Sequence, residues 1–383
     1  MNKNGNMSSL CEPLVNPTDV FEDGESPKPQ QLASDHPNEK QNRSWLWIGL
    51  VMVIAVASLS ISGPVSIHLL RGAGVIDRPA ISSERLTHLI QSRLPSVSFD
   101  DTTTPESRAL VWMTGVDAYN QQSLSDDQLV QRFAMAAVGY SINGLPNWLT
   151  GSHECSWGTG RVGCNPSGQV NQIVARYDSL SGSIPVSIGL LTNIEWLVLN
   201  NNDLVGTIPT ELGGLTALTY LHLDWNDLTG SIPSEIGSPK TLSWLDLSGN
   251  DLTGSIPTEV GGLTALTELD LSRNDFVSAI PSEMGGLTSL TELWLYDNRL
   301  TGTIPVEDGG LTGLNNLLLN NNKLTGTVPP EVGGLTTLTL LYLHNNTLTG
   351  TMPTGVCDVI SPQIDCSEIV CDCCQDSLRQ RCP

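Results

Sequence analysis

Positive charge is scarce in this chain of 383 residues, which holds 18 Lys and Arg against 40 Asp and Glu and has a formal net charge of −22. Because no basic face is available to meet phosphates, this balance excludes nucleic-acid binding. Aromatic residues are also few, at 5%, whereas Gly reaches 36 residues and hydrophobic residues 39%. This composition is typical of a repeat protein that forms one large elongated domain with accessory segments.

The chain also lacks the signatures of common enzymes. It contains no G-x-S-x-G, no kinase catalytic loop and no H-E-x-x-H. Residues 158–163 match G-x-G-x-x-G, but no apolar strand precedes them, no helical pattern follows them, and Cys155 and Cys164 flank them. We therefore expect no enzymatic activity and no cofactor.

A period of 24 residues dominates the second half of the chain. The most regular mark is a recurring Asn, at Asn202, Asn226, Asn250, Asn274, Asn298, Asn322 and Asn346. Each unit reads L-x-x-L-x-L-x-x-N-x-L-x-G-x-I-P-x-E-[LIVM]-G-x-L-x-x. Self-similarity at a fixed period of this size indicates a solenoid. The unit resembles the leucine-rich repeat (LRR), and its G-x-I-P half resembles the plant-type subfamily.

The chemistry of the unit predicts its geometry. In L-x-L both leucines point inward and the residue between them points outward. The Asn that follows can sit inside the turn and bond to backbone groups left unpaired there, so stacked copies form a ladder. We predict an α/β solenoid, a right-handed leucine-rich-repeat superhelix with a parallel sheet on its concave side, a helical N-terminal cap and a disulfide-rich C-terminal cap. Seven repeats occupy residues 189–356.

Three positions depart from the repeat pattern. Phe276 replaces a Leu, Ser278 replaces the Gly before I-P, and Asp308 falls where other units have an apolar residue. We expect a local distortion of the solenoid rather than a break.

The N-terminal part of the chain predicts a membrane anchor. Residues 1–44 are polar and read as a disordered cytosolic tail. Residues 45–70 are almost free of charge and long enough to span a bilayer as one transmembrane helix. A cleaved signal peptide is the alternative, although its n-region would be unusually long. Residues 71–103 then form a juxtamembrane stalk, and helices are expected at 82–94, 104–120 and 125–142.

Cysteine placement predicts the orientation. Cys11 precedes the apolar segment and eight cysteines follow it, in clusters at the two ends of the repeat array. Such clusters indicate disulfide-stapled caps and hence an oxidising compartment, so the N-terminus is cytosolic and the repeats are extracellular or lumenal. Residues 357–383 form the cysteine-rich C-terminal cap, with its connectivity open. His153 with Cys155 and Cys164 would supply three zinc ligands, but the oxidising compartment favours disulfides, and we expect no metal. The sequon at Asn345 is a candidate glycosylation site.

Residues 104–188, the cap and first partial repeat, carry a further resemblance. Helices followed by Trp148, Cys155-Ser156-Trp157 and Cys164 resemble the N-terminal cap of plant-type LRR proteins. The stretches "RALVWM", "LVQRFAMAAVGYS", "NWL" and "ECSW" are similar to those of the membrane-anchored LRR receptor-like proteins of diatoms. The resemblance implies a Cys155–Cys164 disulfide, although the spacing of these two cysteines is longer than in the plant cap.

The repeat register also defines a binding surface. We call the outward positions of the predicted sheet the concave face, and its candidate ligand-binding residues are Trp196, Tyr220, His222, Asp224, Trp225, Trp244, Asp246, Glu268, Asp270, Arg273, Glu292, Trp294, Tyr296, Tyr342 and His344. Aromatic residues interleaved with acids are typical of a recognition surface. The alternative is that the aromatic side chains merely cover the sheet. The acids predict a basic or polyhydroxylated partner.

We therefore predict a membrane-anchored extracellular recognition protein, a receptor-like or adhesion module. Its concave face would bind a protein, peptide or glycan, and any signal would pass through a co-receptor or through the tail of residues 1–44. One alternative is a secreted or wall-associated enzyme inhibitor, like the plant LRR inhibitors of polygalacturonases. Another is ice binding, suggested by a Ser and Thr ladder before I-P. A Glu ladder, of which Glu259 is one member, suggests calcium, but exposed turn residues explain it more simply.

Overall fold

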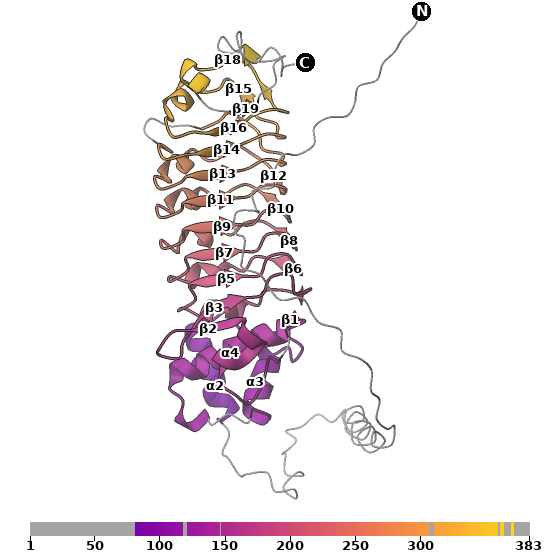
Figure 1. The fold of residues 1–383 in the computed structure, drawn as a ribbon. Coiled ribbons are helices and arrows are strands. Elements are labelled where there is room, and N and C mark those ends of the chain that lie inside the picture. The colour runs from indigo at the N-terminus through magenta and orange to yellow at the C-terminus, as the bar shows by residue number, and fades with distance from the viewer. Residues whose placement is uncertain are drawn as a thin grey trace, which may run out of the picture. The chain divides into compact units, whose positions relative to one another are not determined.

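The computed structural model describes residues 81–117, 121–145, 147–305, 310–358, 361–363 and 369–370. The predicted cytosolic tail, the membrane segment and most of the C-terminal cysteine cluster lie outside these residues. Within the described ranges, no helix is both long enough and apolar enough to cross a bilayer. Figure 1 shows a helical segment followed by coils that are stacked in chain order.

Three helices form the N-terminal segment, each begun by a side chain that caps its free backbone N–H groups. They are α2 (Ser83–Arg93), α3 (Pro105–Gly115) and α4 (Asp126–Ser141). Ser82 accepts from Arg85 N–H, Thr104 accepts from Ser107 N–H, and Ser125 forms a reciprocal capping box with Gln128. Short pieces follow, namely η2 (Gln121–Ser123), β1 (Ile142–Asn143) and η3 (Glu154–Gly160).

Helix α3 ends at Gly115, earlier than the sequence pattern predicts, and Asp117, two residues further on, pairs with a side chain of α4. The Asp117 carboxylate accepts two hydrogen bonds from the guanidinium of Arg132, at 2.5 and 2.6 Å. Both side chains are completely buried. The guanidinium carbon of Arg132 also lies 5.2 Å from the ring centre of Trp112 and 5.1 Å from that of Trp157. This buried ion pair joins the helices to η3.

Cys155 in η3 and Cys164 in β2 (Val162–Cys164) form a disulfide that closes the segment 155–164. Two bonded thiols cannot also bind zinc with His153, so the alternative zinc set is wrong. The G-x-G-x-x-G match falls inside this closed segment, where Gly158 and Gly160 adopt positive φ.

A ten-stranded sheet runs through the whole array and is parallel except where β2 meets β3. Its strands, in spatial order, are β2 (Val162–Cys164), β3 (Val170–Val174), β5 (Trp196–Val198), β7 (Tyr220–His222), β9 (Trp244–Asp246), β11 (Glu268–Asp270), β13 (Glu292–Trp294), β14 (Asn316–Leu318), β16 (Leu340–Tyr342) and β19 (Ser361–Gln363). Leu221 pairs with Leu245 and Leu245 with Leu269, one repeat apart. The predicted LRR solenoid and its register are confirmed.

A second sheet follows the turn in each coil. Its strands are β1, β4 (Ser181–Gly182), β6 (Asp203–Thr207), β8 (Asp227–Gly230), β10 (Asp251–Gly254) and β12 (Asp275–Phe276), and later coils contribute the pairs β15 (Thr325–Gly326) with β17 (Thr347–Leu348) and β18 (Gly350–Thr351) with β20 (Ile369–Val370). Gly230 has φ +81°, and a Cβ there would lie 3.0 Å from the Thr207 methyl of the preceding coil. Both the backbone and the packing therefore require Gly at this position.

Short 3-10 helices form the third side of every coil whose residues are described at this position. They are η4 (Val186–Leu190), η5 (Thr210–Gly214), η6 (Ser234–Gly237), η7 (Thr258–Gly262), η8 (Ser282–Gly286), η9 (Pro330–Gly334) and η10 (Thr354–Asp358). A Pro stands immediately before each of η4 to η9, with φ between −77° and −60°. That restricted φ turns the chain out of the second sheet.

The recurring Asn closes each turn from inside the core. Asn226 Oδ1 accepts from Leu204 N–H of the preceding coil at 3.0 Å, and its Nδ2 donates to Leu199 O and Leu223 O, both at 3.1 Å. The same contacts recur, one coil further each time, at Asn250, Asn274, Asn298, Asn322 and Asn346. Asn202 begins the series on the first partial repeat.

The expected distortion is visible where Ser278 replaces Gly. Ser278 adopts φ 73°, a conformation that costs a residue with a Cβ about 1–2 kcal/mol. The second sheet ends at Phe276, and an isolated bridge between Ala279 and Thr301 continues it. The ten-stranded sheet is unaffected. Asp308 lies outside the described residues, so the distortion expected there stays a prediction.

Candidate functional site

The concave face is the outer surface of the ten-stranded sheet, and its side chains form rows across the coils. One row, in register, is Trp196, Tyr220, Trp244, Glu268, Glu292, Asn316 and Leu340. The next is Val198, His222, Asp246, Asp270, Trp294, Leu318 and Tyr342. The face is therefore aromatic over its first coils and acidic at its centre.

The aromatic side chains of the first coils contact one another. Ring centres lie 5.1 Å apart for Trp196 and Tyr220, 6.2 Å for Tyr220 and Trp244, and 4.5 Å for His222 and Trp244. Trp196 remains 38% exposed, whereas Trp244 is half-buried. Burial, and then the charge of Arg176, lowers the pKa of His222 to about 4, so its ring is neutral at pH 7. The rings are inclined to one another by 51° to 64°, so this cluster offers a largely apolar surface of edges and faces.

A left-handed turn at the end of each strand presents a further row of side chains; the sequence pattern places Trp225 and Arg273 on the face but does not reveal this backbone conformation. The residue before each ladder Asn has a φ between 51° and 62°, at Asn201, Trp225, Gly249, Arg273, Asp297, Asn321 and Asn345. Trp225 is 48% exposed there and covers Gly249, where a Cβ would lie 3.0 Å from the indole. The Arg273 guanidinium lies between Trp225 and Tyr296, at 5.2 and 5.6 Å from their ring centres.

Carboxyl groups crowd the centre of the face. Asp246 is in direct register with Asp270, and Glu268 with Glu292. Burial, reinforced by Asp246, raises the pKa of Asp224 to about 8. Burial raises the pKa of Asp246 to about 6, against hydrogen bonds from Ser248 that lower it.

Two further carboxyl groups of the centre share this behaviour. Burial, then the nearby Asp246, raises the pKa of Asp270 well above its usual range. Burial, then Glu292, raises the pKa of Glu268 to about 7. These pKa values are raised mainly because burial removes water from the carboxylates. Repulsion between neighbouring carboxylates raises several of them further. Much of this acidic patch therefore holds protons near neutral pH.

The concave face collects the buried polar atoms that lack hydrogen-bond partners within the chain. Among the described residues, eleven such side-chain atoms occur, and nine lie on this face, in Asn200, His222, Asp224, Trp244, Ser272, Glu292, Trp294, Asn320 and His344. The other two, in Ser107 and Gln121, belong to the helical segment. A buried polar group without a partner costs about 1–3 kcal/mol, so the cost is concentrated on one surface.

The structure brings most of the predicted site residues together. Those from Trp196 to Tyr296 form one continuous surface across β5 to β13. Tyr342 and His344 lie two coils further on, with their ring centres 5.9 Å apart. Arg176, Asn200 and Asn320 occupy the same row as Asp224 and were not among the predicted residues. Counting in steps of 24 residues from Asp224 finds them, with Asn200 one repeat back, Arg176 two repeats back and Asn320 four repeats forward. Val198 and Leu318 point outward in register but are buried by their neighbours.

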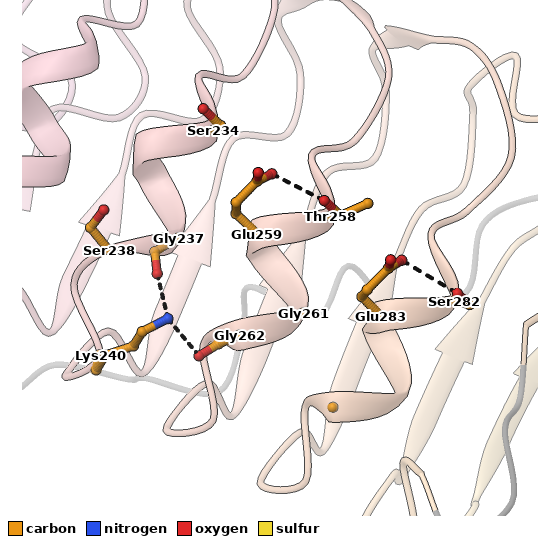
Figure 2. A pocket seen from close by; sticks show the side chains of 11 residues that line it. Ser234, Gly237, Ser238, Lys240, Thr258, Glu259, Gly261, Gly262, Ser282 and Glu283 are labelled. Carbon is orange, nitrogen blue, oxygen red and sulfur yellow. Dashed lines mark hydrogen bonds between the residues drawn. The ribbon is translucent and has the colours of Figure 1, made fainter.

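A second surface hollow lies over the 3-10 helices η6, η7 and η8 (Figure 2). Lys240 Nζ donates there to Gly237 O at 2.7 Å and to Gly262 O at 2.9 Å. Glu259 and Glu283 each accept from the hydroxyl of the preceding residue. Within the described residues, no cluster of His, Cys, Asp or Glu is arranged to hold a metal ion. Because its polar groups are paired, this hollow is a weaker candidate than the concave face.

Comparison of sequences supports the repeat assignment directly. The Leucine Rich Repeat family matches residues 193–215, 217–239, 241–263, 265–287, 289–311 and 313–335. No curated protein matches the chain. The chain thus carries consecutive leucine-rich repeats that coincide with the coils described above.

Several solved structures are similar to the chain. One is a plant peptide hormone receptor, RGFR1, in complex with RGF2, at 40% identity over 46% of this chain and 28% of that one, with a TM-score of 0.44. Another is the Arabidopsis receptor kinase HAESA in complex with the peptide hormone IDA and the co-receptor SERK1. The two are 30% identical over 65% of this chain and 46% of that one, with a TM-score of 0.49. A third is a plant ice-binding protein, which is 21% identical over 64% of this chain and 97% of that one, with a TM-score of 0.42. The chain spans less than half the length of either receptor.

Proposed function

We propose that this protein is an extracellular recognition module whose concave face binds a peptide, a protein segment or a glycan, without a catalytic step of its own. The observation that carries the proposal is the concentration of nine unpartnered buried polar atoms on that face. A surface kept only for stability would favour apolar side chains or complete hydrogen-bond sets at these positions. A ligand supplies the missing donors and acceptors when the side chains reorient towards it.

The aromatic residues support the same proposal. Trp and Tyr contribute large contact areas at little entropic cost and dominate binding hot spots. Trp196 and Trp225 remain exposed although aromatic residues are only 5% of the chain. Together with the acidic centre, they form one continuous surface that is long enough for an extended ligand.

The cellular setting of the proposal is a membrane-anchored receptor-like or adhesion protein. The Cys155–Cys164 disulfide is consistent with an oxidising compartment. The apolar segment at 45–70 would hold the repeats at the membrane, and a co-receptor would carry any signal. The likeness of the cap sequence to diatom LRR receptor-like proteins supports this setting. Protease protection with glycosidase treatment on intact cells tests it, since the repeats and a glycan at Asn345 should be accessible from outside.

The binding proposal is tested with random-peptide and glycan arrays incubated with the full chain. We expect a subset to be retained, and Trp225→Ala with Trp294→Ala to reduce that retention by about tenfold or more, because hot-spot residues carry most binding energy. A control pair on the 3-10 helices η7 and η8 of the intervening coils, Thr258→Ala with Ser282→Ala, should leave retention unchanged. Equal losses in both pairs would contradict a concave site.

Ice binding is a second candidate, favoured by one observation. Thr or Ser is exposed at the end of the second-sheet strand in several coils, as at Thr207, Ser231 and Ser255, although Ala279 interrupts the series. Such a regular hydroxyl array could bind an ordered lattice of water. Thermal hysteresis in the purified protein would support it, and its absence would remove this candidate. No observation on the described residues separately favours an enzyme inhibitor.

A further inference from the structure

We propose that Asp224, Asp246 and Asp270 form a binding subsite for the guanidinium group of an arginine carried by an extended peptide on the concave face. This inference rests on the proposed function, and it names the ligand chemistry at the centre of that surface. It differs from a general acidic attraction because it assigns particular atoms on adjacent coils.

The first argument is the geometry of the carboxyl groups. Asp246 and Asp270 are directly paired in register on β9 and β11, so their side chains stand about 4.8 Å apart at strand spacing. A guanidinium is planar and presents parallel N–H donors, which can reach two carboxylates at that separation. The subsite thus matches arginine better than the single ammonium of lysine.

The second argument is an acceptor without a donor. Asp224 is 6% exposed, and its Oδ1 has no hydrogen-bond partner among the described residues. Its Oδ2 has one weak contact, from Asn200 Nδ2 at 3.4 Å. Asp246 and Asp270, by contrast, accept from the backbone N–H of Ser248 and Ser272. A buried carboxyl oxygen that accepts nothing points to a donor that arrives from outside.

The third argument is that this surface already holds one guanidinium by the same means. Arg273 stacks between Trp225 and Tyr296 and lies 3.7 Å from an oxygen of Asp297. Trp294 pairs with Asp270 in register, and Trp244 lies on the same strand as Asp246. A second guanidinium over the three aspartates would therefore also have an indole beside it.

The raised pKa values of these aspartates add a consequence. In the free protein Asp224 and Asp270 retain protons near neutral pH and Asp246 does so below about pH 6, whereas an arginine binds the ionised form of all three. Binding therefore releases protons, and affinity falls as the pH is lowered. The titratable or charged groups that face the subsite are Arg176, His222, Glu268, Arg273, Glu292, Tyr296 and Asp297.

The test uses two synthetic peptide libraries, random except for a central arginine in one and a central citrulline, its neutral isostere, in the other. With the full chain at pH 8, we expect about tenfold or greater retention of the arginine library, and loss of that preference at pH 5. Calorimetry of a retained peptide in two buffers of different ionisation enthalpy should report proton release at pH 7.

The matched variants decide where the preference originates. Asp246→Asn with Asp270→Asn keeps the acceptor oxygens that Ser248 and Ser272 use, so the fold is retained and the arginine preference should disappear. Glu259→Gln with Glu283→Gln replaces two carboxyl groups on the 3-10 helices η7 and η8 instead, and should leave the arginine preference intact. Equal retention of both libraries overturns the inference. The inference is also overturned, in favour of a metal site, if the chain shows no arginine preference but binds calcium and Asp246→Asn with Asp270→Asn abolishes that binding.

The two proposals fail in different ways. If both libraries bind equally and Trp225→Ala with Trp294→Ala still abolishes binding, the concave site stands and the arginine subsite is wrong. If neither library is retained, the arginine subsite is wrong and the proposed function then depends on glycans alone. If binding survives every concave substitution, the proposed function itself is wrong.

Discussion

Each ladder Asn brings a polar amide into the core together with a full set of partners. Asn274 Nδ2 donates to carbonyls of two coils, and its Oδ1 accepts from Leu252 N–H at 3.1 Å. An isolated buried amide would be a liability, but here its partners are backbone groups that the turn itself leaves unpaired. The repeat therefore fixes the residue type by hydrogen bonding.

Replacing Asn274 with Ala should destabilise the solenoid. Several backbone groups would lose their partner, at about 1–3 kcal/mol for each that stays buried and unsatisfied. Denaturant unfolding measures the change, and Asn316→Ala, on the outward side of β14, serves as the control with an effect of about 0.5 kcal/mol. Similar losses in both variants would contradict the ladder's structural role.

Arg132 is the second residue whose loss should be severe. Arg132→Met would leave the buried Asp117 carboxylate without its cation, at a cost of about 3–5 kcal/mol. Adding Asp117→Leu should recover part of the stability, because the buried charge is then removed too. Thermal melting of the single and double variants checks this, and a double variant that melts no higher than the single one would show that the pairing is not the cause.

At the scale of elements, the structure distinguishes tryptophans that look equivalent in sequence. Trp244 on β9 packs against Tyr220 and His222, whereas Trp225 stands in the left-handed turn after β7 and is about half exposed. Trp244→Ala should therefore lower stability by about 1–3 kcal/mol in addition to any effect on binding. Trp225→Ala should leave the melting temperature nearly unchanged, and an equal fall for both would contradict the distinction.

How much the sequence predicts also depends on the element. The strand register, the ladder and the three helix starts depend on local rules that recur every coil, so they could be predicted from spacing and caps. The left-handed turn before each Asn could not, because Trp225 and Arg273 occupy positions that usually favour Gly. The pairing of Asp117, just beyond α3, with Arg132 could not be predicted either, because no local pattern contains it.

The candidate site follows the same division. Outward residues of the concave face follow from alternation along each strand, and most of them lie together as expected. The state of Asp224 and Asp270 does not follow, since it depends on how completely side chains of neighbouring coils exclude water. Sequence spacing places these carboxyl groups in rows but does not predict their pKa values.

For the whole molecule, the acidic centre predicts an unusual pH dependence. A carboxyl group with a raised pKa holds its proton more tightly when folded, so its stabilising effect is complete below the unfolded value of 3.8. That effect is lost as the pH rises through about 6 for Asp246 and about 8 for Asp224. The lowered pKa of His222 has the opposite effect on stability, which rises with pH between the folded pKa of about 4 and the ordinary value of 6.5.

The free chain should therefore lose stability between pH 6.5 and 8, where only the carboxyl effect operates. We expect a decrease of about 1–3 kcal/mol in the free energy of unfolding. Asp246→Asn with Asp270→Asn should make this loss smaller, because it removes Asp270 and the Asp246 charge that helps to raise the pKa of Asp224, and Glu259→Gln with Glu283→Gln should not. A stability that rises steadily over this range would contradict the raised pKa values.

The most direct test of the concave site is carboxyl footprinting by carbodiimide labelling and mass spectrometry, with and without a ligand retained from the arrays. Glu268 and Glu292 lie on the concave face, while Glu259 and Glu283 lie on the 3-10 helices, close by in the repeat array. The account predicts that the ligand protects Glu268 and Glu292 and leaves Glu259 and Glu283 as reactive as before. Protection of Glu259 and Glu283 instead would place the ligand in the hollow of Figure 2 and contradict the account.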